Sequence, residues 1–536
     1  MTTTIMISNS FTIRFNLDQN NLITSRYRKP FPASRLTGKN KPVRRQAGKE
    51  SLIDRDMLLK FAMLFLCNWV CAIVFAQVPD DSPAAREAAI ARLQKATPCK
   101  VCDGSSAISM PYGTNCNTRE FQAPPILSAP VKQWELNPGW WGVWPPVPIG
   151  NVILTGSCNN DGNEGLSAID KTTGKIVWRI GNICAVGNRR GSTGKVAIYA
   201  LPSGEALLIY PREDGGATDY YVVNIKTGKI VRTLSPVKTG PMRYRGGLFT
   251  VLNQSSKDGF SYITALSADL GSIQWQNKEF KLAMSNNLDP LYTPTFTAPA
   301  SSGGILFQTA RSKDQSEPFT RQLHAIDLKT GKTLWRHTEQ PVMLKRNGLS
   351  YRSDDGIPMI ADGKVIIRLQ SMQWPKAYAS GLRALDPVTG KILWTIDAVP
   401  DRQFAARVSA CGILINEVTT GNNRELIGYR LADGTIAWRR PLSKNAHLLT
   451  SSGGAFYVGE RIVDDNSRYK DHRLQGFDGL TGTLLWTGSY PDYYLGLGTA
   501  NTGWDIENVN SVTPDWIIDG DGAIYGITLK GIFKLK

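Results

Sequence analysis

The sequence is poor in histidine, the side chain best suited to acid–base chemistry and metal binding at neutral pH. Only 4 of its 536 residues are histidines, and they are scattered without ligand spacing, at His324, His337, His447 and His472. No phosphate loop and no nucleophile elbow is present. Basic residues are numerous but dispersed, which does not favour a nucleic-acid groove. The sequence thus argues against zinc enzymes, triad hydrolases, phosphate-loop enzymes and nucleic-acid-binding proteins.

The chain also lacks an apolar run long enough to span a membrane comfortably. Residues 58–76 hold a lysine and an apolar run of about 15 residues that ends in Val74-Phe75-Ala76. This pattern is typical of a secretory signal peptide. Since Met57 stands directly before it, we expect a signal peptide at 57–76 and a mature chain that begins at Gln77, exported to the periplasm or secreted.

Residues 1–56 are then a dispensable extension or a mis-assigned start. An organellar transit peptide is the alternative, because residues 1–49 are rich in Arg, Ser and Thr and poor in acids. Neither Cys67 nor Cys71 follows the small residue of a lipoprotein cleavage site, so we expect no lipid anchor. We also expect no transmembrane span in the mature chain.

Residues 77–124 form a cysteine-containing segment. Ser82 and Pro83 predict the cap and first turn of a short helix that ends near Lys95. Cys99 and Cys102 form a C-x-x-C that lacks the histidine needed for haem attachment, and an exported protein favours disulfides instead. We expect Cys411, in the apolar stretch "SACGILI", to be a buried free thiol. The other five mature cysteines allow two bridges, whose pairing stays open.

What the sequence has in abundance is a repeat, first seen as "LSAIDKTTGKIVW". Its seven copies have alternating residues, a glycine-containing turn and a second apolar stretch, at 166–178, 221–232, 263–275, 323–335, 382–394, 426–438 and 474–486. Such a pattern predicts a β-hairpin in each copy, with glycine supplying a positive φ. The turn glycines are Gly174, Gly228, Gly271, Gly331, Gly390, Gly434 and Gly482.

Six copies close with a tryptophan, and the same six carry alanine or glycine two residues before the turn aspartate position. The copy that ends in Arg232 has Val222 there instead. Ring and small residue thus occur together, which indicates a packing unit. We expect docking by Trp134, Trp178, Trp275, Trp335, Trp394, Trp438 and Trp486.

The copies recur about every 50 residues, the length of four short strands, and a period of this size indicates a propeller or an array. Trp134 has no hairpin before it, whereas residues 513–536 read as strands with no tryptophan strand after them. We therefore predict an all-β fold: an eight-bladed β-propeller over 125–536, monomeric, and closed by residues near 131–136 on a blade begun by the C-terminus.

The repeated A-x-D-x-x-T-G-K-x-x-W phrase resembles the tryptophan-docking motif of the pyrroloquinoline quinone (PQQ)-like propeller superfamily. Its members include quinoprotein alcohol dehydrogenases and BamB, a subunit of the outer-membrane assembly machine. The resemblance covers about residues 125–536 and concerns the fold, because the motif holds blades together and contacts no ligand.

The enzymatic alternative that the resemblance implies is a PQQ-dependent dehydrogenase oxidising alcohols or polymers, with PQQ and calcium as cofactors. Its metal- and cofactor-binding candidates are the oxygen-rich residues Asp505, Glu507 and Asn508 in "TGWDIENVN". The adjacent cysteines that many such enzymes carry are absent from the sequence, and so is the length they devote to covering the quinone. We therefore expect no catalytic residues and no cofactor.

Strand parity places the long connections at 311–322, 370–380, 463–473 and 488–505 on the face opposite the glycine turns. They mix aromatic and basic side chains, as protein-binding surfaces do. The candidate partner-binding residues are Phe319, Arg321, Trp374, Tyr378, Arg468 and Tyr469. We therefore expect an exported, non-catalytic scaffold that binds other proteins; the resemblance to BamB implies envelope or outer-membrane protein assembly.

Overall fold

The computed structural model separates into two units, residues 1–66 and residues 67–536. It describes residues 2–7, 11–16, 78–96, 116–136, 146–157, 165–181, 197–201, 203–210, 219–234, 242–245, 248–254, 260–267, 269–283, 300–311, 321–339, 358–373, 377–463, 469–490, 517–527 and 532–536. In the first unit, β1 (Thr2–Ile7) pairs antiparallel with β2 (Phe11–Asn16).

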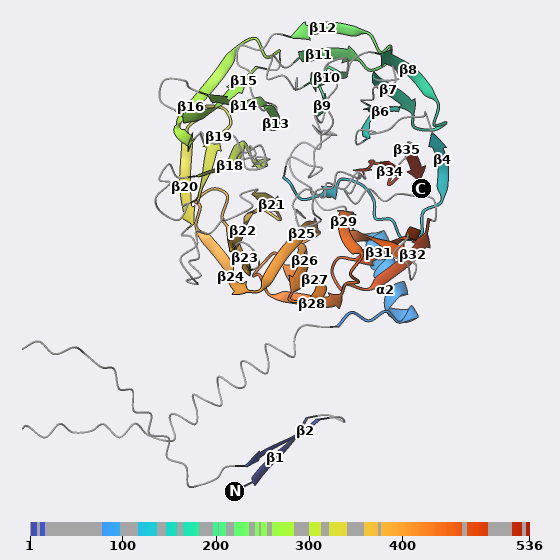
Figure 1. Cartoon of the computed structure of the whole chain (residues 1–536), viewed down its shortest axis with the longest axis vertical. Coiled ribbons are helices and arrows are strands. Elements are labelled where there is room, and N and C mark those ends of the chain that lie inside the picture. Colours follow the sequence, from blue (N-terminus) through green and yellow to red (C-terminus); the bar gives the residue numbers. More distant parts are fainter. Residues whose placement is uncertain are drawn as a thin grey trace, which may run out of the picture. The chain divides into compact units, whose positions relative to one another are not determined.

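The second unit is an eight-bladed β-propeller whose blades are antiparallel sheets arranged as a ring (Figure 1). Blade 1 contains β5 (Val147–Ile149), β6 (Val152–Ser157), β7 (Gly165–Asp170) and β8 (Ile176–Gly181). Blade 2 contains β9 (Ala197–Ala200), β10 (Glu205–Tyr210), β11 (Asp219–Asn224) and β12 (Ile230–Leu234). Blade 3 contains β13 (Met242–Arg245), β14 (Leu248–Gln254), β15 (Phe260–Leu266) and β16 (Ile273–Ala283).

The next three blades have the same order of strands, from the inner strand near the ring axis to the outer strand. Blade 4 contains β17 (Ala300–Ser302), β18 (Ile305–Arg311), β19 (Arg321–Asp327) and β20 (Thr333–Glu339). Blade 5 contains β21 (Met359–Ala361), β22 (Lys364–Gln373), β23 (Ala377–Leu385) and β24 (Ile392–Pro400). Blade 6 contains β25 (Arg402–Ala410), β26 (Ile413–Thr420), β27 (Asn423–Arg430) and β28 (Ile436–Pro441).

The last two blades include segments from both ends of the unit. Blade 7 contains β29 (Ala446–Ser452), β30 (Ala455–Val463), β31 (Tyr469–Asp478) and β32 (Leu484–Ser489), and β3 (Glu120–Phe121) adds a parallel strand to β29. Blade 8 contains β33 (Ile517–Ile518), β34 (Ile524–Ile527), β35 (Ile532–Leu535) and, as its outer strand, β4 (Lys132–Leu136).

Blade 8 closes the ring as the sequence predicts. β4 pairs antiparallel with β35, and the backbones of Val131 and Lys536 exchange hydrogen bonds of 2.8 and 2.9 Å. The blade therefore joins residues that are about 400 apart in the chain. Closure gives every blade a neighbour on both sides, which the end blades of an open array would lack.

The blades are held together by rings that cross from one blade to the next. Trp335 lies opposite Ala325 on its own sheet, and its Nε1 donates to the carbonyl oxygen of Pro387 in blade 5 at 2.9 Å. Equivalent bonds of 2.7–3.1 Å are made by Trp134, Trp178, Trp275, Trp394 and Trp438. Trp486 donates instead to the carbonyl oxygen of Ile126, which precedes β4, at 2.7 Å. Each indole thus satisfies its polar N–H while its ring is largely covered between two sheets.

The turn glycines receive these rings. A Cβ on Gly390 would lie 2.7 Å from the ring of Trp335, and Gly390 has φ +70°. The prediction of a positive φ is wrong for Gly271, where Leu270 takes the left-handed conformation instead, with φ +59°. Blade 2 sends no tryptophan to this turn; its outer strand carries Arg232, which pairs with Glu205 at 2.9 Å.

Two other expectations need correction. Cys411 is not in a strand but in the tight turn between β25 and β26, with φ +44°, and it is not a free thiol because both Cys411 and Cys116 are in disulfides. The stretches 370–380 and 463–473 are not long connections, since β22 reaches Gln373, β23 begins at Ala377 and β31 begins at Tyr469. Continued strand pairing satisfies backbone groups that a loop would leave to solvent.

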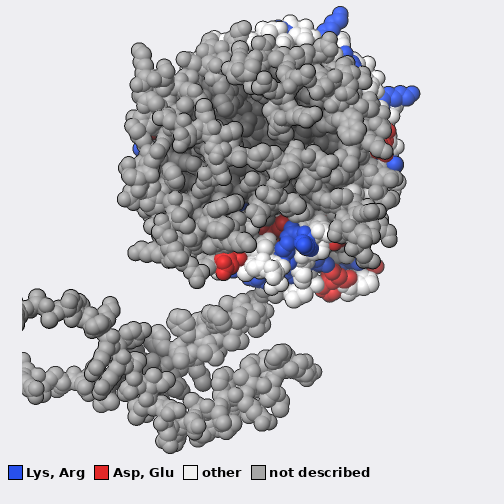
Figure 2. Space-filling view, viewed as in Figure 1, with Lys and Arg blue, Asp and Glu red and all other residues white. Residues whose placement is uncertain are grey.

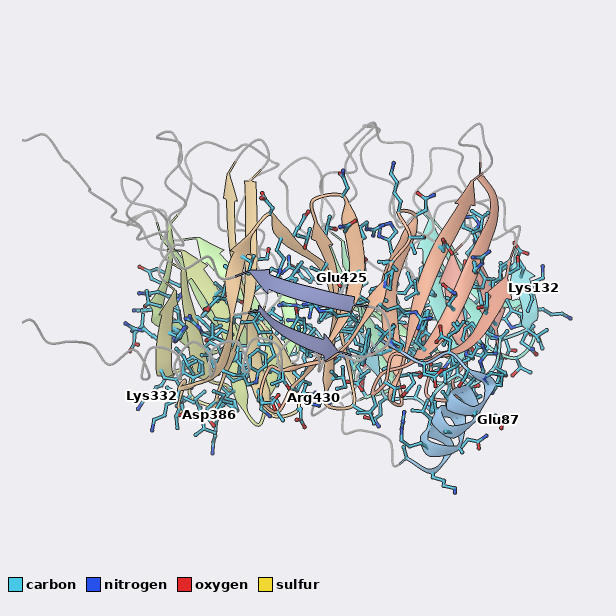
Figure 3. The ribbon with its side chains drawn as sticks, turned by 90° about the horizontal axis from the view of Figure 1, so that it is seen from below. Glu87, Lys132, Lys332, Asp386, Glu425 and Arg430 are labelled. Atoms are coloured by element: carbon cyan, nitrogen blue, oxygen red, sulfur yellow. The ribbon has the colours of Figure 1, made fainter. Side chains whose placement is uncertain are left out.

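The predicted helix is present as α2 (Pro83–Lys95), capped by Ser82, whose Oγ accepts from the Ala85 N–H at 3.2 Å. Figure 3 shows α2 on the same face of the ring as the turn residues Lys332, Asp386 and Arg430. No helix in the described part of the chain is both long and apolar enough to cross a membrane.

Candidate functional site

Three of the expected partner-binding residues are described, and they lie at or near the start of the third strand of their blades. Arg321 begins β19, Tyr378 lies near the start of β23, and Tyr469 begins β31, in blades 4, 5 and 7. All three therefore belong to the end of the ring opposite the glycine turns. Phe319, Trp374 and Arg468 lie outside the described residues.

The hairpins that carry Tyr378 and Tyr469 are described almost to their tips. In blades 5 and 7 the second and third strands pair over nine residues, from beside the glycine turn towards the opposite end of the ring.

The metal and cofactor candidates Asp505, Glu507 and Asn508 lie outside the described residues. Within the described residues, no group of three or more His, Cys, Asp and Glu side chains could hold a metal ion. Arg243 and Arg245 belong to β13, the inner strand of blade 3.

Residues 116–126, here called the strap, run across the inner strands of four blades. Cys116 accepts from the Ile360 N–H of blade 5 at 2.9 Å, Thr118 from the Ser409 N–H of blade 6 at 3.1 Å, and Arg119 from the Ser451 N–H of blade 7 at 3.1 Å. The Cys116 Sγ also lies 3.7 Å from the Ser301 carbonyl oxygen of blade 4. The strap thus connects successive blades inside the ring (Figure 1).

The strap contains a buried carboxyl group, Glu120. Its Oε1 accepts from the Cys411 N–H at 3.2 Å, next to Ser409. Burial raises the pKa of Glu120 to about 7, because desolvation outweighs these hydrogen bonds. A proton on this carboxyl therefore stabilises the strap at neutral pH and below.

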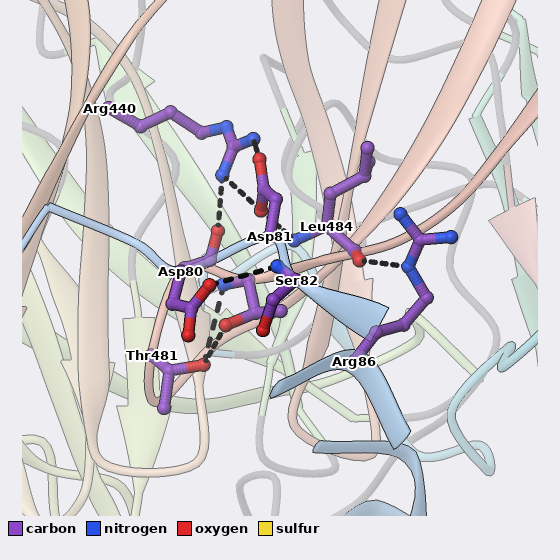
Figure 4. Close-up of polar contacts among 9 residues, drawn as sticks. Asp80, Asp81, Ser82, Arg86, Arg440, Thr481 and Leu484 are labelled. Atoms are coloured by element: carbon purple, nitrogen blue, oxygen red, sulfur yellow. Dashed lines mark hydrogen bonds and ion pairs between the residues drawn. The ribbon is translucent and has the colours of Figure 1, made fainter. Parts of the chain in front are cut away.

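Residues 78–96, here called the arm, cover the outer edge of blade 7 (Figure 4). The Asp81 Oδ1 accepts from the Leu484 N–H at 2.8 Å and from Arg440 Nη1 of blade 6 at 3.0 Å. Arg86 Nε donates to the Leu484 carbonyl oxygen at 3.1 Å. Two side chains of the arm thus take the place of a neighbouring strand on β32.

The helix of the arm packs against blade 7. Ala89 and Leu93 are buried in one cluster with Leu485 and Leu535, and Arg92 forms an ion pair with the buried carboxylate of Asp478. Figure 2 shows acidic and basic side chains interspersed over the described rim near α2, rather than separated into patches. The arm is therefore an integral part of the propeller surface.

A polar cluster between blades 6 and 7 was missed by the sequence analysis. Glu417 accepts from the Leu448 N–H at 3.2 Å, lies 3.5 Å from His447 Nδ1 and pairs with Arg424. Burial alone would raise the pKa of Glu417, but His447 and Arg424 outweigh it and hold the pKa below its usual range. The sequence did contain a signal for this cluster, because Glu417 lies within the apolar stretch "ILINEV" and a buried charge needs a partner.

Comparison with protein families shows that residues 320–533 match the family described as outer membrane protein assembly factor BamB. The structure is similar to BamB from Moraxella catarrhalis at 14% identity and a TM-score of 0.42, covering 76% of this chain and 99% of that one. A comparison with curated proteins found no match.

Oxidoreductases occur among the similar structures as well. A quinohemoprotein alcohol dehydrogenase from Pseudomonas putida is 14% identical with a TM-score of 0.40, covering 78% of this chain and 75% of that one. A europium-containing methanol dehydrogenase is 14% identical with a TM-score of 0.41, covering 75% and 87%. At this identity the likeness concerns the fold alone, which serves different functions in different proteins.

Proposed function

This chain carries a β-propeller of the PQQ-like, BamB-type family, and we propose that it works as an exported, non-catalytic scaffold that binds other proteins. The binding surface is the end of the ring opposite the glycine turns. The finer role that we propose is in envelope or outer-membrane protein assembly. The propeller acts as a monomer whose partner contacts come from several blades.

The hairpins of blades 5 and 7 are the observation that carries this proposal. Their second and third strands pair over nine residues towards this end of the ring. A rigid surface built on strands suits recognition of a folded partner, because little conformational entropy is lost on binding. Tyr378 and Tyr469 stand on these hairpins, and tyrosine is common at interface centres.

Cleavage before Gln77 would leave the described contacts of the arm in the mature chain. Pro79 packs against the turn of blade 7, since a Cβ on Gly482 would lie 2.8 Å from it, and Asp81 is bound by Arg440. The disulfides of Cys116 and Cys411 fit an oxidising compartment such as the periplasm.

The test is site-specific photo-crosslinking in the native host. A photoreactive residue at Trp374, in the connection between β22 and β23 of blade 5, should give one defined protein adduct. The matched control is the same residue at Lys332, on the opposite turn face. An adduct from Lys332 and none from Trp374 would reverse the assignment of the face. Charge removal at Arg468 should weaken the adduct without changing the melting temperature.

The competing function, a PQQ-dependent dehydrogenase, is tested by calorimetry with PQQ and calcium. The proposal expects no tight binding, because a quinone carrying carboxylates requires converging cations and a metal that polarises its carbonyl group. A sub-micromolar Kd that is lost in Asp505→Ala would establish the dehydrogenase instead.

A further inference from the structure

The outer strand of each blade is an edge with unpaired backbone groups, and most blades protect it with a cation. Such edges readily accept another chain, and a basic side chain discourages this. In six of the eight outer strands, which the structure describes along their whole length, a lysine or arginine is present: Lys132 in β4, Arg179 in β8, Arg232 in β12, Lys278 in β16, Arg336 in β20 and Arg439 in β28.

The two exceptions are β32 and β24. The arm covers β32, and under it Leu485 is 2% exposed. In β24 the corresponding residue, Leu393, is 47% exposed and its neighbour Ile392 is 52% exposed. Nothing in the described part of the chain covers this pair.

The two strands correspond residue by residue. Ile392 lies opposite Leu385 and Trp394 opposite Ala384, just as Leu484 lies opposite Phe477 and Trp486 opposite Gly476. The Leu484 N–H and C=O point outward, since Asp81 and Arg86 bind them. The same register directs the N–H and C=O of Ile392 outward from blade 5.

The charges around Ile392 favour a carboxylate there. On blade 7, Asp81 is held by Arg440, which follows Trp438 by two residues on the preceding blade. Blade 4 precedes blade 5, and its corresponding residue is His337, two residues after Trp335. The Nε2 of His337 lies 3.4 Å from the Nη1 of Arg383. An acidic side chain that accepts from Ile392 would therefore meet an imidazole and a guanidinium group.

We propose that the outer edge of blade 5, at Ile392 and Leu393, is a docking site for a partner protein segment that resembles the arm. The segment presents a carboxylate to the Ile392 N–H, a basic side chain to the Ile392 carbonyl oxygen, and an apolar helix face to Leu393 and Val388, which is 68% exposed. This site is separate from the end of the ring opposite the glycine turns, so it stands or falls independently of the proposed function.

The test uses the full chain and a labelled synthetic peptide with the sequence of residues 78–95, followed by fluorescence anisotropy. The chain's own arm covers blade 7, so added peptide should bind at blade 5, saturably and with a Kd below about 1 mM, which corresponds to about 4 kcal/mol. A peptide with asparagine at the position of Asp81 should bind about tenfold more weakly, as expected for one charge-assisted hydrogen bond.

The decisive variant is Leu393→Arg, which places a charge in the apolar pair and should abolish binding. The matched control is Val177→Arg, the same position on β8, which is also exposed and should leave binding unchanged. Equal melting temperatures verify folding. If Leu393→Arg does not fold, a photoreactive peptide on the unmodified chain should label blade 5.

Three outcomes overturn the proposal. The first is the absence of saturable binding. The second is unchanged binding to folded Leu393→Arg or labelling confined to blades 6 to 8, since the peptide then exchanges with the chain's own arm. The third is a dimer in sedimentation that Leu393→Arg dissociates, because the occupant is then a second copy.

Discussion

Trp335 of blade 4 lies on Gly390 of blade 5 so closely that a Cβ on this glycine would be 2.7 Å from the indole ring. The Trp335 Nε1 also donates to the Pro387 carbonyl oxygen in the same turn. One side chain thus contributes apolar contact and a hydrogen bond to a turn 55 residues further along the chain. The stability of the ring depends on such pairs, since each joins two sheets that share no strand.

Trp335→Ala should lower the free energy of unfolding by roughly 3–5 kcal/mol, the cost of truncating a large packed aromatic residue. Arg232→Ala is the matched change in blade 2, where only a partly exposed ion pair with Glu205 is lost, worth about 1 kcal/mol or less. Denaturant titration measures both. Equal losses in the two variants would contradict the docking account.

Gly390→Ala and Gly271→Ala should differ although both residues occupy the same place in the repeat. Gly390 has φ +70° and faces an indole, so alanine should cost more than about 2 kcal/mol through backbone strain and steric clash. A Cβ on Gly271 would meet only the Asp269 carboxylate at 3.3 Å, so its cost should be below about 1 kcal/mol. Thermal melting of both variants measures this difference in stability, and equal losses would contradict it.

The propeller should lose stability as pH rises from about 4.5 to about 7, the pKa of Glu120 in the folded chain. The sign follows because the folded state keeps this proton while the unfolded state releases it. The loss amounts to about 3 kcal/mol. Glu120→Gln should flatten this part of the pH profile of chemical denaturation. Glu87→Gln, on the exposed face of α2, should leave it unchanged.

Asp81→Ala should release the arm from blade 7. Two charge-assisted bonds are lost, to Arg440 and to the Leu484 N–H, which are worth about 1.5–3 kcal/mol when made to a charged group. Limited proteolysis should then cut within residues 78–96 while the rest of the ring resists. Asp80→Ala is the control, and cleavage at the same rate in both would show that Asp81 does not hold the arm.

The exported protein should begin at Gln77. The signal-peptide pattern ends at Ala76, and Pro79 is the first residue with a described contact to blade 7. N-terminal sequencing of protein recovered from the host envelope checks this. Finding residues 1–56 still attached would remove the basis for both the cleavage site and the export proposal.

The sequence by itself determined the blades. The alternation, the turn glycine, the small residue and the tryptophan all fall within about 13 residues, so the hairpin and its periodicity can be read locally. The unmatched Trp134 and the final strands likewise predicted the closing blade. Each is an incomplete repeat, and together the two make one complete blade. Ser82 and Pro83 located the start of α2 for the same local reason.

Only the tertiary structure decided which groups meet across the ring. The turn glycines are predicted from φ alone, but Gly390 also makes room for a ring from the preceding blade, whereas Gly271 receives no ring and keeps an ordinary φ. The strap, the arm and the turn position of Cys411 are not part of the repeat, so the repeat pattern does not predict them. They depend on burial and on partners hundreds of residues away, which local sequence patterns do not encode.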